Sequence, residues 1–334
     1  MKALVLKGFG SPDILSYENV PDPSPGKNDL LIKVHAVSVN RVLDVAIRSG
    51  KGERYGIKPP HILGVDPSGV VVKTGRNVEG FETGDRVSVT MGMPDGRRFG
   101  IECNGGDAEL TVAPASCCVK VPKEISFAEA TVIARHGPVA YNLLFNMGNL
   151  EAGKTALIFG ASGNLGSIGI QLAKAAGAIV IAGAGSEQRA AIGYDLGADH
   201  VVNYNREDLV EAVMAFTNGE GVDLFYDNIA NPDVCPKGIE CLKRQGRMVT
   251  AGSHGGPIVP INFHTVYHRQ ISILGNPRSN CADAVPCFES AVNKKLKVII
   301  DRIVPLFEGP VMHSLIEGPE GNKVGKIILD PTLK

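Results

Sequence analysis

The sequence predicts an α/β protein of two domains, an antiparallel β domain and a doubly wound parallel sheet. The chain has 334 residues, and the usual domain size of about 100–200 residues makes two domains the expected number. Short β-rich runs separated by turns fill the first third of the chain. After residue 155, apolar runs alternate with helical segments, which is typical of parallel strands joined by crossover helices.

Turn residues delimit the predicted strands of the first third. The segment Val20-Pro-Asp-Pro-Ser-Pro-Gly26 cannot lie inside a helix because of its prolines, and Gly75, Gly80 and Gly84 interrupt the later runs. Closely spaced short strands favour an antiparallel barrel or sandwich. We expect strands over residues 2–7, 30–37, 69–74 and 85–90.

The second part of the chain begins with a helix signal at Ser126. Glu129 follows this serine at the spacing of a capping box, so a helix is expected to start there. The predicted strands then cover 156–159, 179–182, 201–204, 224–228, 247–250 and 271–274, with helices over 164–176 and 187–196. A helix over 284–294 and a strand over 326–329 complete the chain.

Composition argues against several classes of function. Lys plus Arg total 34 and Asp plus Glu total 35, a formal net charge of −1, so the chain lacks the basic surface that nucleic acid or an anionic membrane attracts. No stretch reaches the roughly 18 apolar residues of a membrane span, and residues 1–9 lack the pattern of a signal peptide. We expect a cytoplasmic protein with a small-molecule substrate and no nucleic-acid or membrane partner.

Cysteine spacing indicates reduced thiols. The chain has seven cysteines and no Cys-x-x-Cys pair. Neither a disulfide framework nor a four-cysteine zinc lobe is therefore predicted.

The strongest motif is Leu157-Ile-Phe-Gly160-Ala-Ser-Gly163-Asn-Leu-Gly166-Ser-Ile-Gly169. Its glycines follow an apolar strand and open a helix, which permits a tight turn and lets a pyrophosphate approach backbone N–H groups. Glycines at this spacing also occur in ordinary loops, but the flanking strand and helix favour a dinucleotide site. The predicted contacts are Gly160, Ser162, Gly163, Asn164, Leu165 and Gly166.

The end of the second predicted strand favours NADP(H). An NAD site usually has Asp or Glu about 20 residues after the glycine turn, bound to the ribose 2′-OH, whereas this chain has Ala182-Gly-Ala-Gly-Ser186. We interpret Gly183 and Gly185 as room for a 2′-phosphate, Ser186 as its hydrogen-bond donor and Arg189 as its charged partner. The alternative is that Arg189 is a solvated residue of the next helix.

Several segments together resemble the medium-chain dehydrogenase/reductase superfamily. They are Met1-Lys-Ala-Leu-Val-Leu, Val20-Pro-Asp-Pro, Gly84-Asp-Arg-Val87, the glycine turn, Leu196-Gly-Ala-Asp-His200 and Gly325-Lys-Ile-Ile-Leu329. The resemblance covers nearly the whole chain. It implies a GroES-like β-barrel catalytic domain, residues 1–124 and 285–334, with a Rossmann NADP-binding domain, residues 125–284, inserted between its parts. It also implies a homodimer joined near residues 271–274.

The resemblance implies further cofactor contacts at strand ends. Tyr204 falls where some NADPH-dependent reductases of the superfamily have a tyrosine near the 2′-phosphate. The other implied contacts are Asn228, Ala230, Gly252, Gly275, Asn276 and Lys326.

The chain departs from the zinc alcohol dehydrogenases of this superfamily at all three ligand segments. These read Asn40-Arg-Val-Leu-Asp44, Gly64-Val-Asp66 and Arg135-His136. Val65 replaces a histidine and cannot bind zinc, and the structural zinc lobe has only Cys103. We predict no metal; the alternative is a rearranged zinc site of His61, His136 and Asp66.

This pattern resembles the zinc-free quinone oxidoreductase branch. Without a Lewis acid to stabilise an alkoxide, reduction of an electrophilic carbon is easier than oxidation of an alcohol. We predict an NADPH-dependent oxidoreductase that transfers hydride to a quinone or an α,β-unsaturated carbonyl compound. The alternatives are a zinc-type alcohol dehydrogenase with a rearranged site, an enoyl-thioester reductase and a non-catalytic NADPH-binding protein.

Three side chains are candidates for the catalytic site. Asn40 is interpreted either as an amide donor to a substrate oxygen or as a helix cap. Tyr55 is either a substrate contact on a loop or a packed tyrosine. His136 is either a proton donor near neutral pH or a structural histidine.

Four charged residues have supporting roles in this interpretation. Arg41 and Arg135 favour an anionic product if they face the pocket, and are otherwise surface or ion-paired arginines. Asp44 and Asp66 are expected to orient neighbouring groups.

Overall fold

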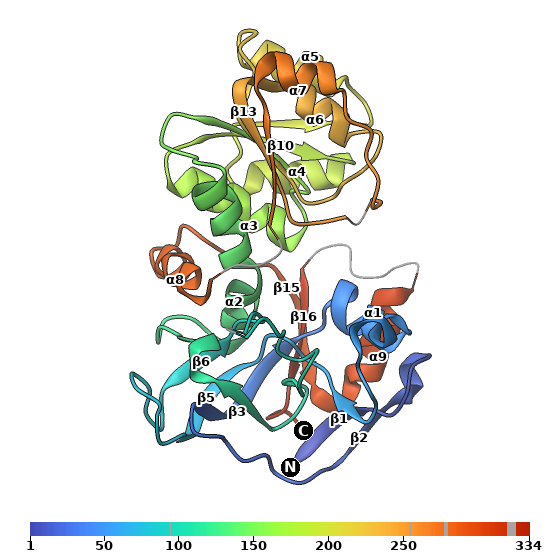
Figure 1. The fold of residues 1–334 in the computed structure, drawn as a ribbon, viewed down its shortest axis with the longest axis vertical. Coiled ribbons are helices and arrows are strands. Elements are labelled where there is room, and N and C mark those ends of the chain that lie inside the picture. The colour runs from blue at the N-terminus through green and yellow to red at the C-terminus, as the bar shows by residue number, and fades with distance from the viewer. Residues whose placement is uncertain (94, 254, 277–279, 319–324) are drawn as a thin grey trace. The chain divides into compact units, whose positions relative to one another are not determined.

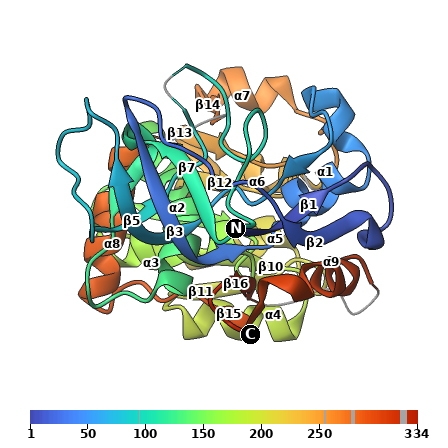
Figure 2. The same cartoon turned by 90° about the horizontal axis from the view of Figure 1, so that it is seen from below.

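The computed structural model describes residues 1–93, 95–253, 255–276, 280–318 and 325–334. Its contacts divide the chain into two compact units, whose segments can be followed by colour in Figure 1. Unit 1 consists of Met1–Arg135, Asn280–Phe288 and Val298–Lys334, and unit 2 of His136–Ser279 and Glu289–Lys297. The chain therefore ends in the unit in which it begins, and both termini belong to unit 1 (Figure 2).

Unit 2 is built on a six-stranded parallel sheet. Its strands are β9 (Thr155–Phe159), β10 (Ile179–Ala184), β11 (His200–Asn203), β12 (Val222–Asp227), β13 (Leu242–Thr250) and β14 (Ser272–Gly275). The spatial order is β11-β10-β9-β12-β13-β14, and all neighbours are parallel. From β9 the chain adds β10 and β11 on one side of the sheet, and it then adds β12, β13 and β14 on the other side. The boundary between β9 and β12 is therefore the switch point of a doubly wound sheet.

Helices cover both faces of this sheet. They are α3 (Asn164–Ala175), α4 (Glu187–Asp195), α5 (Leu209–Phe216), α6 (Cys235–Glu240) and α7 (Phe263–Arg269). One face, which includes Leu157 and Ile181, packs against α5 and α6. The opposite face meets α3, where Gly169 lies against the ring of Tyr226. The alternation of side chains along each strand thus supplies two buried faces.

Unit 1 contains two sheets. The strands of the small sheet, in the order β2-β1-β4, are β1 (Lys2–Leu6), β2 (Leu15–Asn19) and β4 (His61–Ile62). The seven-stranded sheet comprises β3 (Asp29–Ser38), β5 (Ser68–Thr74), β6 (Arg86–Val89), β7 (Leu110–Pro114), β8 (Cys118–Lys120), β15 (Ile300–Pro305) and β16 (Lys326–Asp330). Its order is β15-β16-β3-β5-β6-β8, with β7 also paired to β3. All of these pairs except β15 with β16 are antiparallel.

Four further helices lie between strands of the chain. They are α1 (Ala46–Arg48), α2 (Phe127–Tyr141), α8 (Ala284–Val292) and α9 (Gly309–Glu317). Short 3₁₀ turns cover Pro12–Ile14, Lys51–Tyr55, Ala115–Cys117, Cys281–Asp283 and Leu306–Glu308, and π-helical turns cover Arg41–Val45 and Asn142–Met147. The predicted capping box of α2 is confirmed, because Ser126 N donates to Glu129 Oε2 at 2.9 Å and Glu129 N donates to Ser126 Oγ at 3.2 Å.

The last strand is held in unit 1 by pairing and by a shared core. Leu329 of β16 pairs with Val37 of β3 in antiparallel register. Both side chains are buried in one cluster with Leu4 of β1. Apolar side chains from the two ends of the chain are thus removed from water together, which stabilises the return of the chain to this unit.

Every strand and helix expected from the sequence is present, with bounds shifted by a few residues. The elements that were not predicted are β2, β4, β7, β8, β15, α1, α5, α6, α7 and α9. All seven cysteines are free thiols, as expected. Within the described ranges, no helix is long and apolar enough to cross a membrane.

Candidate functional site

The residues predicted to bind a dinucleotide lie, with one exception, at one edge of the unit 2 sheet. Each stands at the carboxyl end of a strand, in the loop that follows it or in the first turn of the next helix: the turn 160–166, Ser186, Arg189, Tyr204, Asn228, Ala230, Gly252, Gly275 and Asn276. The carboxyl ends of parallel strands share an edge, and ligands of doubly wound sheets bind there. The exception is Lys326, which belongs to unit 1.

The glycine turn after β9 depends on the absence of side chains. Gly160 has a φ of 76°, a conformation that favours glycine. A Cβ on Gly160 would lie 2.7 Å from Asn228 Oδ1, and a Cβ on Gly166 would lie only 2.1 Å from Gly160 O. Gly163 N donates to Gly160 O at 2.9 Å and closes the turn. The first turn of α3 can therefore pack directly on the end of β9.

The N-terminus of α3 fits a phosphate group. Gly163 is the N-cap residue and brings no capping side chain. Ser167 N donates to Gly163 O at 2.8 Å, whereas the N–H groups of residues 164–166 have no partner within the helix. Such N–H groups and the helix dipole together attract anions. The turn and helix start therefore fit the pyrophosphate of a dinucleotide.

Other strand ends shape the same edge through their backbones. Asn228 Nδ2 donates to Phe159 O at 2.7 Å, which ties β12 to β9. A Cβ on Gly252 would lie 2.2 Å from Asn228 O. Ala230 has a φ of 55° and its N–H donates to Asp227 Oδ2 at 3.0 Å. Asp227 was not predicted from the sequence, and its carboxylate fixes the loop in which Ala230 lies.

Three residues predicted to meet a 2′-phosphate lie at one corner of unit 2. Ser186 caps α4, where its Oγ accepts a hydrogen bond from Arg189 N at 3.3 Å. A Cβ on Gly185 would lie 3.0 Å from Tyr204 Oη. Burial raises the pKa of Tyr204, and the nearby charge of Arg189 opposes this rise. The structure thus brings Ser186, Arg189 and Tyr204 together.

The same corner contains charged residues that the sequence analysis missed. Glu187 Oε1 accepts a hydrogen bond from Asn203 Nδ2 at 2.6 Å and lies 3.4 Å from Arg206 Nε. Arg206 thus places a positive charge beside the carboxylate of Glu187, and Asn203 holds that carboxylate in place. The position of Glu187 directly after Ser186 in the sequence could have indicated that its carboxylate lies at this corner.

The interpretation of Gly183 needs correction. A Cβ at this position would lie 2.4 Å from Cδ1 of Phe159. Phe159 is buried in the core that the sheet forms with α5 and α6. Gly183 therefore admits an aromatic ring and is not needed to make room for a phosphate.

Lys326 lies beside Asn40 because of the pairing of β16 with β3. Ile328 is opposite Ser38, so the antiparallel register carries Lys326 to Asn40. Lys326 Nζ donates to Asn40 Oδ1 at 2.5 Å and to Val39 O at 3.3 Å, and only 5% of the residue is exposed. Its contact with a cofactor stays a prediction.

A buried polar network surrounds the pair of Lys326 and Asn40. Asp66 accepts hydrogen bonds from Ser38 N at 2.9 Å, Ser38 Oγ at 2.6 Å and Asn40 Nδ2 at 3.1 Å. Asp44 accepts one from Asn40 N at 2.7 Å. The oxygen and the nitrogen of the Asn40 side-chain amide are thus both hydrogen-bonded within the protein. This amide does not cap the turn that follows. Asp44 and Asp66 orient their neighbours, as their interpretation proposed.

Burial dominates the electrostatics of this network. It raises the pKa of Asp44 to about 6, with the charge of Asp66 adding to the rise. Burial also raises the pKa of Asp107, again helped by Asp44 and Asp66. It lowers the pKa of Lys326 to about 8, against the attraction of the two carboxylates. Burial also lowers the pKa of Arg135, and the charges of Asp66 and Asp44 oppose this decrease. Three carboxyl groups and two cations therefore share one region of low dielectric.

Tyr55 lies in unit 1, and His136 is the first residue of unit 2. Tyr55 ends the turn Lys51–Tyr55 and is 37% exposed. The guanidinium carbon of Arg98 lies over the ring of Tyr55, 4.6 Å from the ring centroid. His136 is half-buried on α2, at the first position of unit 2. The catalytic roles of both residues stay predictions.

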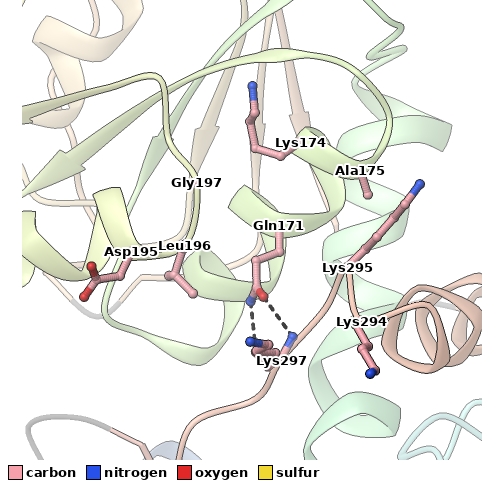
Figure 3. A pocket seen from close by; sticks show the side chains of 9 residues that line it. All are labelled: Gln171, Lys174, Ala175, Asp195, Leu196, Gly197, Lys294, Lys295 and Lys297. Atoms are coloured by element: carbon pink, nitrogen blue, oxygen red, sulfur yellow. Dashed lines mark hydrogen bonds between the residues drawn. The ribbon is translucent and has the colours of Figure 1, made fainter.

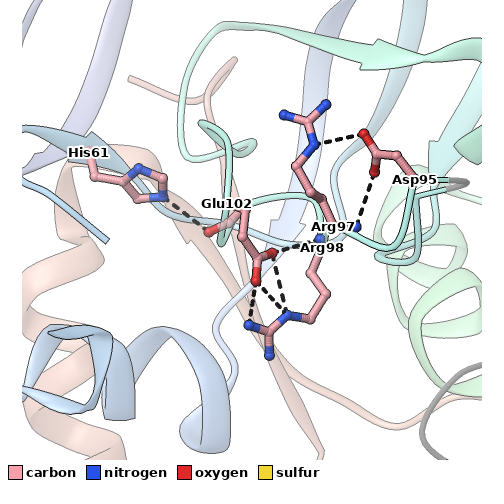
Figure 4. Close-up of polar contacts among 6 residues, drawn as sticks. His61, Asp95, Arg97, Arg98 and Glu102 are labelled. Carbon is pink, nitrogen blue, oxygen red and sulfur yellow. Dashed lines mark hydrogen bonds and ion pairs between the residues drawn. The ribbon is translucent and has the colours of Figure 1, made fainter. Parts of the chain in front are cut away.

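The side chains present do not fit a zinc ion. His61 Nε2 lies 3.2 Å from Gly100 O, and Figure 4 shows this contact beside the ion pairs of Arg97 with Asp95 and Arg98 with Glu102. Asp66, another residue of the rearranged site considered above, accepts three hydrogen bonds. Across the described part of the chain, no three His, Cys, Asp or Glu side chains are placed to hold a metal ion.

A lysine-lined pocket of 420 Å³ in unit 2 is separate from the dinucleotide edge. It lies at the C-terminal ends of α3 and α4, which in a βα unit are far from the carboxyl ends of the strands. Its lysines point in different directions (Figure 3). Lys174 Nζ is bound to Asp199 Oδ2 at 2.7 Å. The helix C-termini that border the pocket carry negative partial charge.

Two family models match the chain. The family described as "Alcohol dehydrogenase GroES-like domain" matches residues 26–123, and the family described as "Zinc-binding dehydrogenase" matches residues 165–293. The predicted fold class, a GroES-like β domain with a Rossmann doubly wound sheet, is confirmed.

Individual similar proteins are oxidoreductases. The NAD-dependent alcohol dehydrogenase of Sulfolobus acidocaldarius is 30% identical over 99% of this chain and 100% of its own. The quinone oxidoreductase of Homo sapiens is 30% identical over 82% of this chain and 79% of its own. The crystal structure of Escherichia coli quinone oxidoreductase complexed with NADPH has a TM-score of 0.81 and 25% identity, and the match covers 99% of this chain and 100% of the other.

The packing of the glycine turn predicts a difference between two variants. Gly166→Ala is expected to lower the free energy of unfolding by about 1–3 kcal/mol, because the added methyl group overlaps Gly160 O. Gly163→Ala is the matched control, since its Cβ would lie 3.4 Å from the same oxygen, and its effect should stay within about 0.5 kcal/mol. Urea unfolding without cofactor measures both. Equal stability of the two variants would contradict the packing described here.

Proposed function

This chain belongs to the medium-chain dehydrogenase/reductase superfamily and is an oxidoreductase, and we propose that it reduces quinones or α,β-unsaturated carbonyl compounds with NADPH and without a catalytic zinc. One observation carries the proposal. Asn40, Asp44 and Asp66 lie in segments where zinc alcohol dehydrogenases of the superfamily have their ligands, and here they form a buried network in which Lys326 binds Asn40.

The network supports reduction of an electrophilic carbon. Asp66 directly follows Val65, the position at which the zinc enzymes have a histidine ligand. Its carboxylate accepts hydrogen bonds from Ser38 and Asn40. Lys326 brings a cation into a region of low dielectric, where its charge acts strongly on a developing anion. An enone or quinone gains such an anion on its oxygen when hydride adds to it. An unactivated alcohol is easier to ionise when a Lewis acid stabilises its alkoxide.

The chain's own residues can hold a dinucleotide in unit 2. A reduced nicotinamide, when bound, supplies the hydride. The turn 160–166 and the N-terminus of α3 would hold the pyrophosphate, because their N–H groups and lack of side chains suit a close anion. Asn228, Gly252 and Asn276 line the same edge of the sheet.

The residues at the corner of Ser186 support NADP(H) over NAD(H). Ser186 and Tyr204 carry hydroxyl groups, and Arg189 is an exposed cation beside them. The carboxylate of Glu187 is held by Asn203 and Arg206, so its repulsion of a phosphate is reduced. This corner of the chain would therefore accept a 2′-phosphate.

We also propose a homodimer joined along β14. This strand ends the sheet order among the described residues, and 39% of Ile273 is exposed there. An unpaired strand edge with an exposed apolar side chain is a surface on which a second copy can pair.

A substrate panel tests the proposed reaction. NADPH is expected to be consumed with quinones and enones, and a chelator should not slow the reaction because no step requires a metal. The measurement is the loss of NADPH absorbance with quinones, enones, acyl thioesters and aldehydes, each with and without EDTA.

Other outcomes of the panel favour other functions. Activity on aldehydes alone that disappears with EDTA would indicate a zinc alcohol dehydrogenase. A preference for acyl thioesters would indicate an enoyl-thioester reductase. Tight NADPH binding without consumption of any substrate would indicate a binding protein.

Cofactor choice has its own test in Arg189→Ala. Loss of a charge-assisted contact of about 1.5–3 kcal/mol should weaken NADPH binding by roughly 10- to 100-fold and leave NADH binding nearly unchanged. Arg244→Ala, at an exposed arginine of β13, is the control and should change neither affinity. Fluorescence titration measures both cofactors. An equal loss for NADPH and NADH would refute the 2′-phosphate role of Arg189.

A further inference from the structure

The turn after β11 is fastened to the turn after β10 at one corner of unit 2. Asn205 Nδ2 donates to Gly185 O at 2.8 Å, and Tyr204 N donates to Ala184 O at 3.2 Å. The two strands are parallel neighbours, so both turns lie at the carboxyl edge of the sheet. Arg206 directly follows Asn205, and its backbone is therefore held at the corner that is proposed above to accept a 2′-phosphate.

The backbone of Arg206 is fixed, whereas its side chain is largely exposed. Arg206 N donates to Asn203 O at 2.8 Å. The Nε atom of Arg206 lies 3.4 Å from Glu187 Oε1, and the side chain of this arginine is 74% exposed. Exposed ion pairs contribute little to stability, so the guanidinium can leave Glu187 at small cost. Glu187 Oε1 would then keep the hydrogen bond that it accepts from Asn203 Nδ2 at 2.6 Å.

A 2′-phosphate at this corner calls for more than one cation. A phosphate monoester carries a charge of about −1.5 to −2 near pH 7. Arg189 supplies one positive charge, whereas Glu187 and Glu207, which Asn203 binds through its side chain and its backbone N–H, add negative charge. Arg206 can supply a second positive charge, because its planar guanidinium is able to donate two parallel hydrogen bonds to a phosphate.

We propose that Arg206 is a determinant of cofactor choice, whose guanidinium exchanges Glu187 for the 2′-phosphate when NADP(H) binds. Glu187 competes with the phosphate for Arg206 and so limits the affinity for NADP(H). NAD(H) has a hydroxyl group in place of this phosphate, and with it the ion pair of Arg206 and Glu187 stays closed. This proposal rests on the preference for NADP(H) proposed above, and it adds a second cation and an opposing carboxylate to that preference.

Arg206→Gln is the main variant because it removes the charge and keeps a polar side chain. It should weaken NADPH binding by about 5- to 20-fold, since it removes a charge-assisted contact, and should change NADH binding by less than about twofold. Arg206→Lys, which keeps the charge, should restore part of the NADPH affinity. Arg244→Gln, at an exposed arginine of β13, is the matched control and should bind both cofactors as wild type does. Fluorescence titration measures the dissociation constants.

Two fragments of the cofactors isolate the contribution of the phosphate. Both contain the adenosine, but 2′,5′-ADP carries the 2′-phosphate and 5′-AMP lacks it. Isothermal titration calorimetry should show weaker binding of 2′,5′-ADP to the Arg206→Gln variant and unchanged binding of 5′-AMP. This measurement involves neither the nicotinamide nor turnover.

Glu187→Gln tests the competition for Arg206. The new side chain still has an oxygen for Asn203 but no charge to hold the guanidinium. NADPH binding should become about two- to fivefold tighter, which corresponds to the loss of an exposed ion pair. The gain should be smaller when Arg206→Gln is also present, because the ion pair is already absent there. Glu220→Gln, at an exposed glutamate beyond α5, is the matched control and should show no gain.

Three results would overturn the proposal. The first is Arg206→Gln protein that binds NADPH as tightly as wild type. The second is an equal loss of NADPH and NADH in that variant, which would indicate a structural ion pair. The third is a Glu187→Gln variant whose NADPH affinity is unchanged, or rises equally with and without Arg206. Failure of the proposed function is distinguishable because it appears in the wild-type protein, as tighter binding of NADH than of NADPH or as no consumption of NADPH with any quinone or enone.

Discussion

Antiparallel pairing of β16 with β3 is the interaction on which the buried polar cluster of unit 1 depends. The register places Ile328 opposite Ser38 and so brings Lys326 to Asn40 across 286 positions of sequence. A buried ammonium group is costly unless acceptors and opposite charges surround it, and β3 and its following turn supply them in Asn40 and Asp44. Loss of this pairing would take Lys326 away from Asn40 and would leave the carboxylates of Asp44 and Asp66 with one cation fewer.

Unit 2 depends on close backbone packing at the carboxyl edge of its sheet. Gly160 and Gly166 let α3 begin against the end of β9, and Gly183 admits the ring of Phe159. The high glycine content of the chain, 40 residues, thus has several physical causes at this edge. The tight packing leaves the turn free of side chains that would keep a phosphate away, and the corner of Tyr204 adds a hydroxyl group and a nearby cation.

The parts of the fold that local patterns specify could be predicted from the sequence. The glycine turn and the capping box at Ser126 involve residues within a few positions of one another, and both were placed correctly. The partner of Lys326 could not be predicted, because it depends on strand register between distant segments. Gly183 was misinterpreted for the same reason, since Phe159 reaches it across the sheet. The stacking of Tyr55 under Arg98 likewise joins two loops with no local signal.

The central claim is that Lys326 is a buried ammonium group held among carboxylates, and NMR of ¹³C-lysine-labelled protein tests it most directly. The Cε resonance of Lys326, assigned by its loss in Lys326→Arg, can be followed against pH beside that of exposed Lys73. Burial should place the titration midpoint of Lys326 at a pKa of about 8, well below the value of about 10.4 for an ordinary lysine. A midpoint that coincides with that of Lys73 would contradict the account.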